Sequence, residues 1–193
     1  MEIIRNIFDG IVLIKPDVFG DERGYFFESF NEDKYKEHLG DVRFVQDNIS
    51  KSTRGVIRGL HYQIGNAAQG KLCHVLKGRV LDVAVDIRVG SPTFGGYYAA
   101  ELSEENHHQL WIPPGYAHGF SVLSDDVIFH YKCTALYHKS SERAVRYDDP
   151  AIGIKWQVDN PIVSAKDAMA PLLSEIAPDF TFTPGAASGI FTP

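Results

Sequence analysis

Residues 71–88 read KLCHVLKGRVLDVAVDIR, and this stretch decides the fold. From position 81 to position 87, apolar residues at the odd positions alternate with Asp, Ala and Asp at the even positions. Side chains of a β-strand point alternately to opposite faces of a sheet, so a period of two predicts a strand. The stretch therefore indicates β-structure at the centre of the chain.

Similar short β-like runs lie on both sides of this stretch. They are separated by Gly, Pro, Asn and Asp, and no helix between them is long enough to connect parallel strands. Many short strands without such helices indicate antiparallel sheets, so we expect an all-β sandwich or jelly roll. The further runs are VIRGLHYQ (56–63), GGYYAAELS (95–103), HQLWIPP (108–114), GFSVLS (119–124) and VIFHYKCTALY (127–137).

A few short helices are expected beside the sheets. Asn31 can cap the segment EDKYKEHL (32–39), which stops before a glycine. A second helical segment, SAKDAMAPLLSEI (164–176), is interrupted by Pro171, which cannot continue a helix. Both segments flank the predicted strands instead of separating them.

Length and composition limit the class of protein. The 193 residues, 44% of them hydrophobic, fit one domain, expected at 1–180, followed by a mobile Gly, Ala and Pro tail at 181–193. The net charge of −6 argues against a nucleic-acid partner. Two cysteines without C-x-x-C spacing argue against a disulfide framework and a thiolate zinc site. Because no stretch looks like a signal peptide or a membrane span, we expect a cytoplasmic protein without a membrane partner.

The segment GNAAQGKL (65–72) is similar to a phosphate-binding P-loop. A P-loop needs Ser or Thr after its lysine and then a helix, whereas here Leu72 follows Lys71 and a strand-like alternation continues. We therefore expect no nucleoside-triphosphate site. On a strand, Lys71 would share a face with Cys73 and Val75 and point to an apolar interior; the alternative is an exposed lysine at a strand edge.

Two fragments are similar to the metal-binding motifs of cupins. PPGYAHGF (113–120) places His118 at the spacing of the second motif, and GLHYQ (59–63) places His61 where the first motif begins. The first motif also needs a second histidine and a glutamate, but this chain has Gln63 and then no acidic residue before position 71. Three or four ligands cannot be assembled from these positions, so we expect no metal.

Tyr131 and His61 each have two interpretations. Tyr131 shares a period-two face with Val127 and Phe129, so its hydroxyl should point into the core. It is either a core tyrosine with a hydrogen-bond partner or an acid at the wall of a cavity. The same choice applies to His61, and the two residues by themselves leave both interpretations open.

Six blocks of the chain recur together in one known family. They are DERGYFFESF (21–30), FVQDNIS (44–50), VIRGLHYQ (56–63), QGKLCHVLKGRVLDVAVDIR (69–88), IPPGYAHGF (112–120) and YKCTALY (131–137). The six blocks have the order and approximate spacing that they have in that family, and SAKDA (164–168) supplies its late aspartate. The chain therefore resembles the dTDP-4-dehydrorhamnose 3,5-epimerase family. The resemblance implies a cupin-type jelly roll (double-stranded β-helix) without metal or cofactor, working as a homodimer on a dTDP-linked 4-keto-6-deoxyhexose.

The same resemblance implies functions for individual residues. His61 would be the general base, oriented by Asp167, and Tyr131 the acid on the opposite side of the sugar. Lys71 and His118 would face the ketone and neighbouring hydroxyls. The residues implied for binding thymine and diphosphate or for completing the pocket are Arg23, Glu28, Gln46, Asp47, Asn48, Arg58, Glu142 and Lys166. At position 166 the family often has arginine, and a lysine there keeps the charge but loses the bidentate geometry.

The implied reaction is epimerisation of dTDP-4-dehydro-6-deoxy-D-glucose at C3 and C5 to dTDP-4-dehydro-L-rhamnose. A C–H bond beside a ketone is a weak acid, so an imidazole can remove its proton only if the enolate oxygen is stabilised, for which Lys71 is the candidate. Inversion also requires a proton donor on the opposite face. The alternatives are a 3- or 5-epimerase, a ketoisomerase, a non-catalytic sugar-nucleotide-binding cupin and a metal-dependent cupin oxygenase.

Strand geometry raises one difficulty with this set of residues. Arg58 and His61 are three positions apart, which puts them on opposite faces of a regular strand. Either Gly59 bulges the strand and re-aims Arg58, or Arg58 reaches the site of a partner subunit. For the expected dimer, the aromatic segment YFFESF (25–30) is a candidate edge strand that pairs across a two-fold axis.

Overall fold

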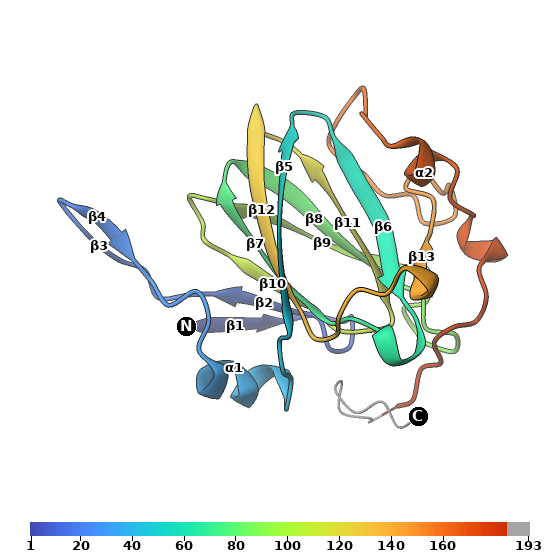
Figure 1. The fold of residues 1–193 in the computed structure, drawn as a ribbon, viewed down its shortest axis with the longest axis horizontal. Helices are drawn as coiled ribbons and strands as arrows, with labels where there is room; N and C mark the ends of the chain where they lie inside the picture. The colour runs from blue at the N-terminus through green and yellow to red at the C-terminus, as the bar shows by residue number, and fades with distance from the viewer. Residues whose placement is uncertain (185–193) are drawn as a thin grey trace.

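Two antiparallel β-sheets form the body of the protein (Figure 1). The computed structural model describes residues 1–184. One sheet consists of β1 (Glu2–Arg5), β2 (Val12–Lys15), β5 (Gln46–Thr53), β7 (Lys71–Lys77), β10 (Gln109–Ile112) and β12 (Asp126–Cys133). The other consists of β6 (Ile57–Gln63), β8 (Arg79–Asp86), β9 (Tyr97–Ser103), β11 (Tyr116–Val122) and β13 (Glu142–Ala144). Every run predicted from the sequence contains a strand, which confirms the all-β jelly roll.

The strand orders show that, apart from the consecutive pairs β1–β2 and β8–β9, neighbours in the two sheets are distant in sequence. The six-stranded sheet has the order β1-β2-β10-β7-β12-β5, and the five-stranded sheet has the order β13-β6-β11-β8-β9. Outside them lie a hairpin of β3 (Phe19–Asp21) and β4 (Gly24–Phe26), the helices α1 (Glu32–Leu39) and α2 (Ala165–Ala168), and the 3₁₀ turns η1 (Gly65–Ala67), η2 (Lys139–Ser141) and η3 (Leu173–Glu175).

The space between the sheets is filled with apolar side chains. On β8, Val80 and Ala84 belong to this central core, so the even positions of the 81–87 alternation face the interior. The odd positions, beginning with Leu81, belong to a second apolar cluster on the outside of the five-stranded sheet, which also includes Trp156 and Leu173 of the C-terminal segment. Both faces of β8 are therefore buried, and the acidic residues of the alternation lie on the inner one.

The two short helices lie where the sequence predicts helical segments. The side chain of Asn31 accepts a hydrogen bond from the amide of Lys34 at 3.3 Å, which confirms the predicted cap of α1. Tyr35 and Leu39 of this helix pack against the outside of the six-stranded sheet. The later segment forms α2 and η3, and Pro171 lies between them as its sequence indicates.

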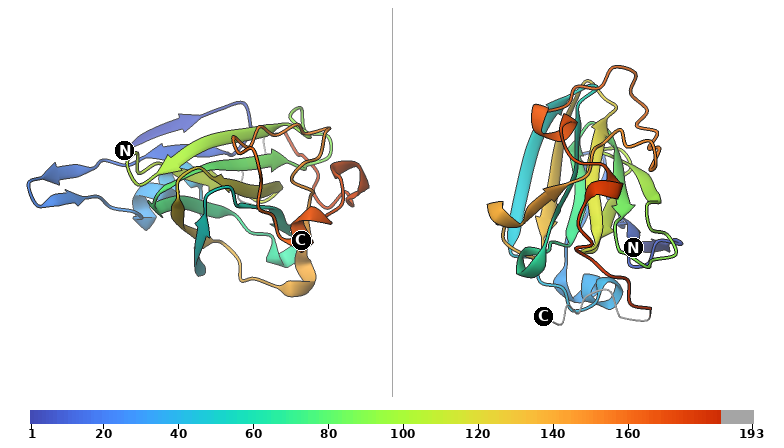
Figure 2. Two further views of the ribbon diagram at one scale, coloured as in Figure 1. Left: turned by 90° about the horizontal axis from the view of Figure 1, so that it is seen from above. Right: turned by 90° about the vertical axis from the view of Figure 1, so that its right-hand side faces the viewer.

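The hairpin β3–β4 extends away from the body, as Figures 1 and 2 show in two views. The aromatic segment 25–30, expected as an edge strand, is a strand only as far as Phe26 and pairs with β3 alone. The segment therefore forms a strand over only its first two residues, and its pairing across a two-fold axis stays a prediction. The hairpin exposes Phe19, Tyr25 and Phe26, each with at least 60% of its surface accessible.

The C-terminal end of the described chain returns to the body. Thr181 forms a parallel bridge with Val89, and the amide of Phe182 donates to the carbonyl of Val89 at 2.9 Å. Most of the expected tail, 185–193, lies outside the described residues. Within 1–184, no helix combines the length and the apolar character needed to cross a membrane.

Candidate functional site

A cavity of about 490 Å³ lies between the two sheets. This volume falls within the range of roughly 300–1,000 Å³ that is usual for small-molecule pockets. β6 and β11 contribute to one wall, β5, β7 and β12 to the facing wall, and α2 with the preceding segment to a third side. The lining residues are Ser50, Val56, Ile57, Arg58, His61, Lys71, His118, Phe120, Tyr131, Ile162, Val163, Ser164, Lys166 and Asp167.

A bulge in β6 brings Arg58 and His61 to this cavity together. On the neighbouring β11, His118 lies opposite His61 and Phe120 lies opposite Arg58, so three steps along β6 match two along β11. Gly59 has a φ of +134°, and a Cβ at this position would lie 2.5 Å from the Cα of Gly119. Only glycine fits such a close approach of two backbones. The bulge expected at Gly59 is confirmed, and one chain suffices to place both side chains.

His61 and Asp167 form a hydrogen-bonded pair at the cavity wall. Nε2 of His61 lies 2.7 Å from Oδ1 of Asp167, and the Gly59 amide donates to Oδ2 at 3.4 Å. Burial raises the pKa of Asp167, but hydrogen bonds with His61, Gly59 and Ser164 together hold it below its usual value. Asp167 is therefore ionised at neutral pH and orients the imidazole so that Nδ1 points away from the carboxylate.

Lys71 points into the interior, as its strand position predicts. Only 9% of its surface is accessible, and Nζ donates to the carbonyl of His61 at 3.4 Å. The same Nζ lies 5.8 Å from the centroid of the Tyr131 ring. Burial lowers the pKa of Lys71, while nearby acidic groups, Asp82 among them, act in the opposite sense. The ammonium thus approaches a residue of each sheet, His61 and Tyr131, at the wall of the cavity.

Tyr131 lies on β12, in the sheet that faces His61. Its ring packs against Phe129 in the central core, and burial raises the pKa of its hydroxyl to about 12. The phenol therefore keeps its proton at neutral pH. Because the two residues lie on facing sheets and line the same cavity, a bound molecule can have one of them on each side.

His118 forms a second pair with a carboxylate, deeper in the barrel. Its Nε2 lies 2.7 Å from Oδ1 of Asp82 and 3.8 Å from Sγ of Cys73. Burial lowers the pKa of His118, and the Asp82 carboxylate opposes this effect. Sequence reasoning missed Asp82. The available signal was an acidic residue in the middle of a strand whose two faces are both buried.

The residues implied for binding divide into three groups. Gln46 and Asn48 lie on one face of β5 and hydrogen-bond each other at 3.0 Å, whereas Asp47 lies on the other face and pairs with Lys132 at 2.8 Å. Arg58, Lys71, His118 and Lys166 line the cavity. Glu142 pairs with Lys166 at 2.6 Å and so lies beside it.

Arg23 and Glu28 form the third group and lie apart from the cavity lining of the described chain. Arg23 is on the hairpin, where it pairs with Asp21 at 2.5 Å and its side chain is 84% exposed. Glu28 pairs with Lys34 at the start of α1. A single chain therefore does not bring these two residues to the others.

Several cavity residues carried no signal that the sequence analysis used. Ser50 lines the cavity, and Ser52, two positions further along β5, accepts a hydrogen bond from Nε of Arg58 at 2.9 Å. Both lie on the β5 face that carries Gln46 and Asn48, so strand periodicity could have found them. The apolar wall formed by Ile162 and Val163 comes from an irregular segment, for which periodicity gives no prediction.

Cys73, Asp82 and His118 are the group within residues 1–184 whose donor atoms could converge on a metal ion, all within 4.8 Å of one another. Their chemistry fits a metal poorly. Burial holds the pKa of Cys73 well above its usual value, so its thiol is protonated. The buried ammonium of Lys71 also lies close enough to influence both Cys73 and His118. A divalent cation would need the thiolate and would be repelled by the lysine.

Comparisons with known proteins agree on one family. The family model for dTDP-4-dehydrorhamnose 3,5-epimerase matches residues 6–175. A Shigella flexneri protein named dTDP-4-dehydrorhamnose 3,5-epimerase is 53% identical over 168 residues, which cover 86% of this chain and 93% of that protein. A Streptomyces niveus protein named dTDP-4-dehydrorhamnose 3-epimerase is 34% identical over 168 residues, covering 86% of this chain and 81% of the relative.

Solved structures extend the similarity to three dimensions. The crystal structure of dTDP-6-deoxy-D-glucose-3,5-epimerase from Legionella pneumophila Philadelphia 1, in complex with dTDP-4-keto-L-rhamnose, has a TM-score of 0.90. Its sequence is 50% identical, and the match covers 94% of this chain and 98% of that one. At this identity and coverage, the two proteins share a family as well as a fold.

Proposed function

Since this chain belongs to the dTDP-4-dehydrorhamnose 3,5-epimerase family, we propose that it converts dTDP-4-dehydro-6-deoxy-D-glucose to dTDP-4-dehydro-L-rhamnose by inverting C3 and C5. One observation carries the proposal: His61 and Tyr131 lie on facing sheets and line the same cavity, with Lys71 in contact with both. This arrangement is what removal of a proton from one face and its replacement from the other require.

His61 is the general base of the proposed reaction. The ionised Asp167 carboxylate binds Nε2, so Nδ1 is the nitrogen available to take the proton at C3 or C5. As the imidazole becomes positive, the same carboxylate stabilises it. In this mechanism Asp167 is the orienting partner of the base.

The ketone at C4 takes up the electron pair that each C–H bond leaves behind. Lys71 is the donor to the resulting enolate oxygen, because it lines the same cavity and its buried ammonium lies between the His61 backbone carbonyl and the Tyr131 ring. In a site shielded from water, one such donor is typically worth about 3–4 kcal/mol of transition-state stabilisation. His118 completes this wall of the site.

Tyr131 returns a proton from the opposite face. Its raised pKa keeps the hydroxyl protonated, so it is a donor at neutral pH. After one inversion His61 has gained a proton and Tyr131 has lost one, and exchange with water must restore both before the second carbon reacts. Solvent hydrogen therefore enters the sugar at each inverted carbon.

The nucleotide is bound by residues near the mouth of the cavity in this proposal. Arg58 and Lys166 supply positive charge for the diphosphate, and Gln46 and Asn48 on the inner face of β5 offer amides to the thymine. The side chain of Asp47 points away from the cavity on the opposite face of β5 and pairs with Lys132. Asp47 would therefore contribute to nucleotide binding either by positioning Lys132 or with its own backbone groups. Glu142 holds Lys166 in place.

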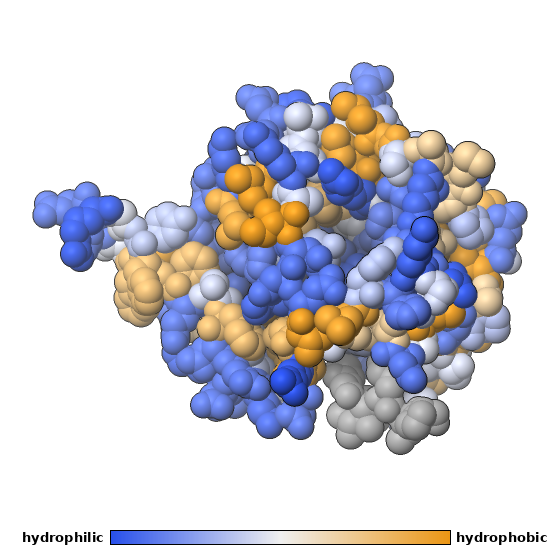
Figure 3. Space-filling view, in the orientation of Figure 1, coloured by the Kyte–Doolittle hydropathy of each residue, from blue (hydrophilic) through white to orange (hydrophobic). Residues whose placement is uncertain are grey.

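We propose that the active form is a homodimer in which the hairpin β3–β4 reaches a second copy of the chain. The hairpin exposes aromatic side chains away from the body, and Figure 3 shows further hydrophobic surface over β5 and β12, where Ile49 is 67% exposed. Arg23, expected in the site, lies on this hairpin and not at its own cavity. Sedimentation should give twice the 21.5 kDa of one chain at micromolar concentration. A monomer at that concentration would refute the dimer.

The cytoplasm is the proposed compartment, because in the described chain both cysteines are free, buried thiols. A second candidate function is 3-epimerisation alone, which the name of the Streptomyces niveus relative favours. The residues discussed so far serve inversion at either carbon.

Incubation with dTDP-4-dehydro-6-deoxy-D-glucose in heavy water tests the proposed function. We expect proton magnetic resonance to show deuterium at both C3 and C5 and a sugar of the L-rhamno configuration. Deuterium at C3 alone, together with inversion at that carbon, would instead establish the 3-epimerase. Absence of deuterium from both carbons would favour a binding protein without turnover.

A further inference from the structure

Asp82 is a carboxylate on the inner face of β8, between Val80 and Ala84 of the central core. None of its surface is accessible, and it is absent from the cavity lining. A buried ionised group among apolar side chains is costly unless it is paired and hydrogen-bonded. An apolar residue at this position would continue the core, so the carboxylate calls for an explanation.

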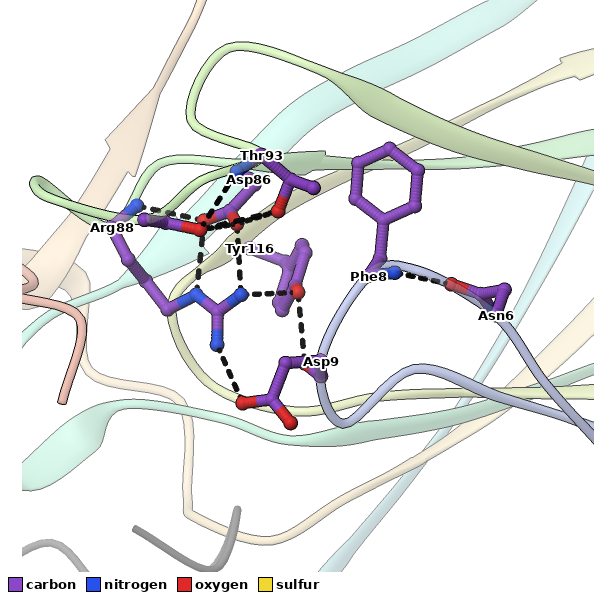
Figure 4. Close-up of polar contacts among 8 residues, drawn as sticks. Asn6, Phe8, Asp9, Asp86, Arg88, Thr93 and Tyr116 are labelled. Atoms are coloured by element: carbon purple, nitrogen blue, oxygen red, sulfur yellow. Dashed lines mark hydrogen bonds and ion pairs between the residues drawn. The ribbon is translucent and has the colours of Figure 1, made fainter. Parts of the chain in front are cut away.

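The contacts of Asp82 leave its bonding incomplete. Oδ1 lies 2.7 Å from Nε2 of His118, whereas the buried Oδ2 has no hydrogen-bond partner within residues 1–184. For comparison, Asp86 lies four residues along the same strand and on the same face, and both of its oxygens are bonded. Figure 4 shows Asp86 held by Arg88, with Thr93 also bonded to it. Both oxygens of Asp86 accept hydrogen bonds, as expected of a buried carboxylate that stabilises the fold. Only one oxygen of Asp82 has a partner, and that partner is His118.

The pairing with Asp82 sets which end of the His118 ring faces the cavity. His118 lines the cavity, and its Nε2 is the atom bound to Asp82. A carboxylate can only accept, so Nε2 must carry a hydrogen. In the neutral ring, Nδ1 then carries a free lone pair and is a hydrogen-bond acceptor.

We propose that Asp82 is a positioning residue: it fixes His118 as the Nε2–H tautomer, so that Nδ1 accepts a hydrogen bond from a hydroxyl of the bound sugar and holds the ring for proton transfer. This inference rests on the proposed function. His118 is kept neutral by burial and by the positive charge of Lys71 on β7, with His61 on β6 adding a smaller effect of the same sign. The protonated thiol of Cys73 is the remaining group in contact with Nε2.

Two substitutions separate positioning from a purely electrostatic effect. Asp82→Leu removes the acceptor and replaces the carboxylate with a branched apolar side chain. Asp82→Asn removes the charge but keeps a carbonyl oxygen that can accept from Nε2–H. If Asp82 acted only as a counter-ion to Lys71, the two variants would be equally impaired.

The readout is the tautomer of His118, measured by nitrogen-15 resonance of the free protein, together with deuterium uptake from heavy water. In Asp82→Leu we expect a mixture of neutral tautomers and a kcat/KM for dTDP-4-dehydro-6-deoxy-D-glucose that is lower by about 10²-fold, as is usual on loss of a group that orients a functional histidine. Asp82→Asn should keep the Nε2–H form and stay within about tenfold of the unsubstituted protein. Binding of dTDP should be unchanged in both. Asp82→Leu leaves the buried Nε2–H of His118 without an acceptor, which costs about 1–3 kcal/mol and lowers the Tm by about 2–12 °C.

Asp86→Asn is the matched control, because it removes a buried carboxylate from the same face of β8. It should lower the Tm but leave the His118 tautomer and deuterium uptake unchanged. An unchanged tautomer or kcat/KM in Asp82→Leu would overturn the proposal, as would equal impairment of Asp82→Leu and Asp82→Asn. If the unsubstituted protein binds dTDP but takes up no deuterium, the proposed function fails, while the tautomer measurement still decides whether Asp82 orients His118.

Discussion

Substitution of Gly59 should show how strongly the bulge in β6 controls the site. A Cβ on this residue would lie 2.5 Å from the Cα of Gly119 and 2.9 Å from the carbonyl oxygen of His118. Carbon atoms in contact are normally about 3.5–4.0 Å apart, so β6 and β11 would have to separate by about 1 Å. Gly59→Ala also forces alanine to a φ of +134°, which is strained regardless of the space available.

The two effects give an estimate of the loss of stability. Overpacking costs about 1–3 kcal/mol and the strained φ a further 1–3 kcal/mol, so we expect a loss of about 4 kcal/mol. For a chain of this length, that loss lowers the Tm by about 8–16 °C. Because β11 carries His118 and β6 carries His61, a shift of about 1 Å should also reduce kcat by about 10²-fold.

Gly65→Ala is the control for this prediction. Gly65 also has a positive φ, +60°, but a Cβ there meets no described atom within 4 Å. It should therefore show strain without overlap, a loss of about 1 kcal/mol and a Tm lower by about 2–4 °C. Differential scanning calorimetry and turnover of both variants test the reasoning. If Gly59→Ala melts together with Gly65→Ala and retains full turnover, the close approach of β6 and β11 does not control the site.

Three further predictions follow from other parts of the site and core. Lys71→Ala should reduce kcat by about 10²–10³-fold with a smaller change in KM, since the donor acts on the enolate oxygen; a change confined to KM would contradict this. The purified protein should hold no stoichiometric metal and be indifferent to EDTA, because the thiol of Cys73 is protonated and Lys71 is nearby; loss of activity to EDTA and its recovery with a divalent ion would disprove this. Burial and the charges of His130, Lys132 and His107 lower the pKa of His74 to about 4, so between pH 6.5 and 4 the unfolded chain takes up a proton that the folded chain does not. This group should therefore remove about 2 kcal/mol of stability between pH 7 and pH 5, measured by urea denaturation, and His74→Gln should show that much less pH dependence.

The strands and the first helix were predictable because their signals are local. Alternation identified every strand from β6 to β12, and the side chain of Asn31 marked the start of α1. Alternation does not say which face of a strand turns inward when both are buried, and so the environment of Asp82 was missed. The projecting hairpin was also missed, since nothing in its sequence distinguishes an arm from an edge strand.

The site was predictable in its residue types more than in its geometry. His61, Lys71, Tyr131 and Asp167 came from the resemblance to a known family, and the structure places all four at one cavity. The two walls of that cavity belong to different sheets. Their strands come together only when one sheet packs on the other, and the alternation within a single strand does not predict that packing. Arg23 shows the limit most clearly, because its distance from the cavity in one chain depends on the direction of a hairpin that projects from the body.

The central claim is that His61 and Tyr131 act on opposite faces of the sugar. Deuterium exchange by Tyr131→Phe, followed by proton magnetic resonance in heavy water, tests it most directly, with His61→Ala measured in parallel. In Tyr131→Phe the base remains and can return a solvent hydrogen to the side it came from, so we predict deuterium in the unreacted sugar with little inversion. His61→Ala should show neither exchange nor inversion. Undiminished inversion by Tyr131→Phe, or rapid exchange by His61→Ala, would contradict the account.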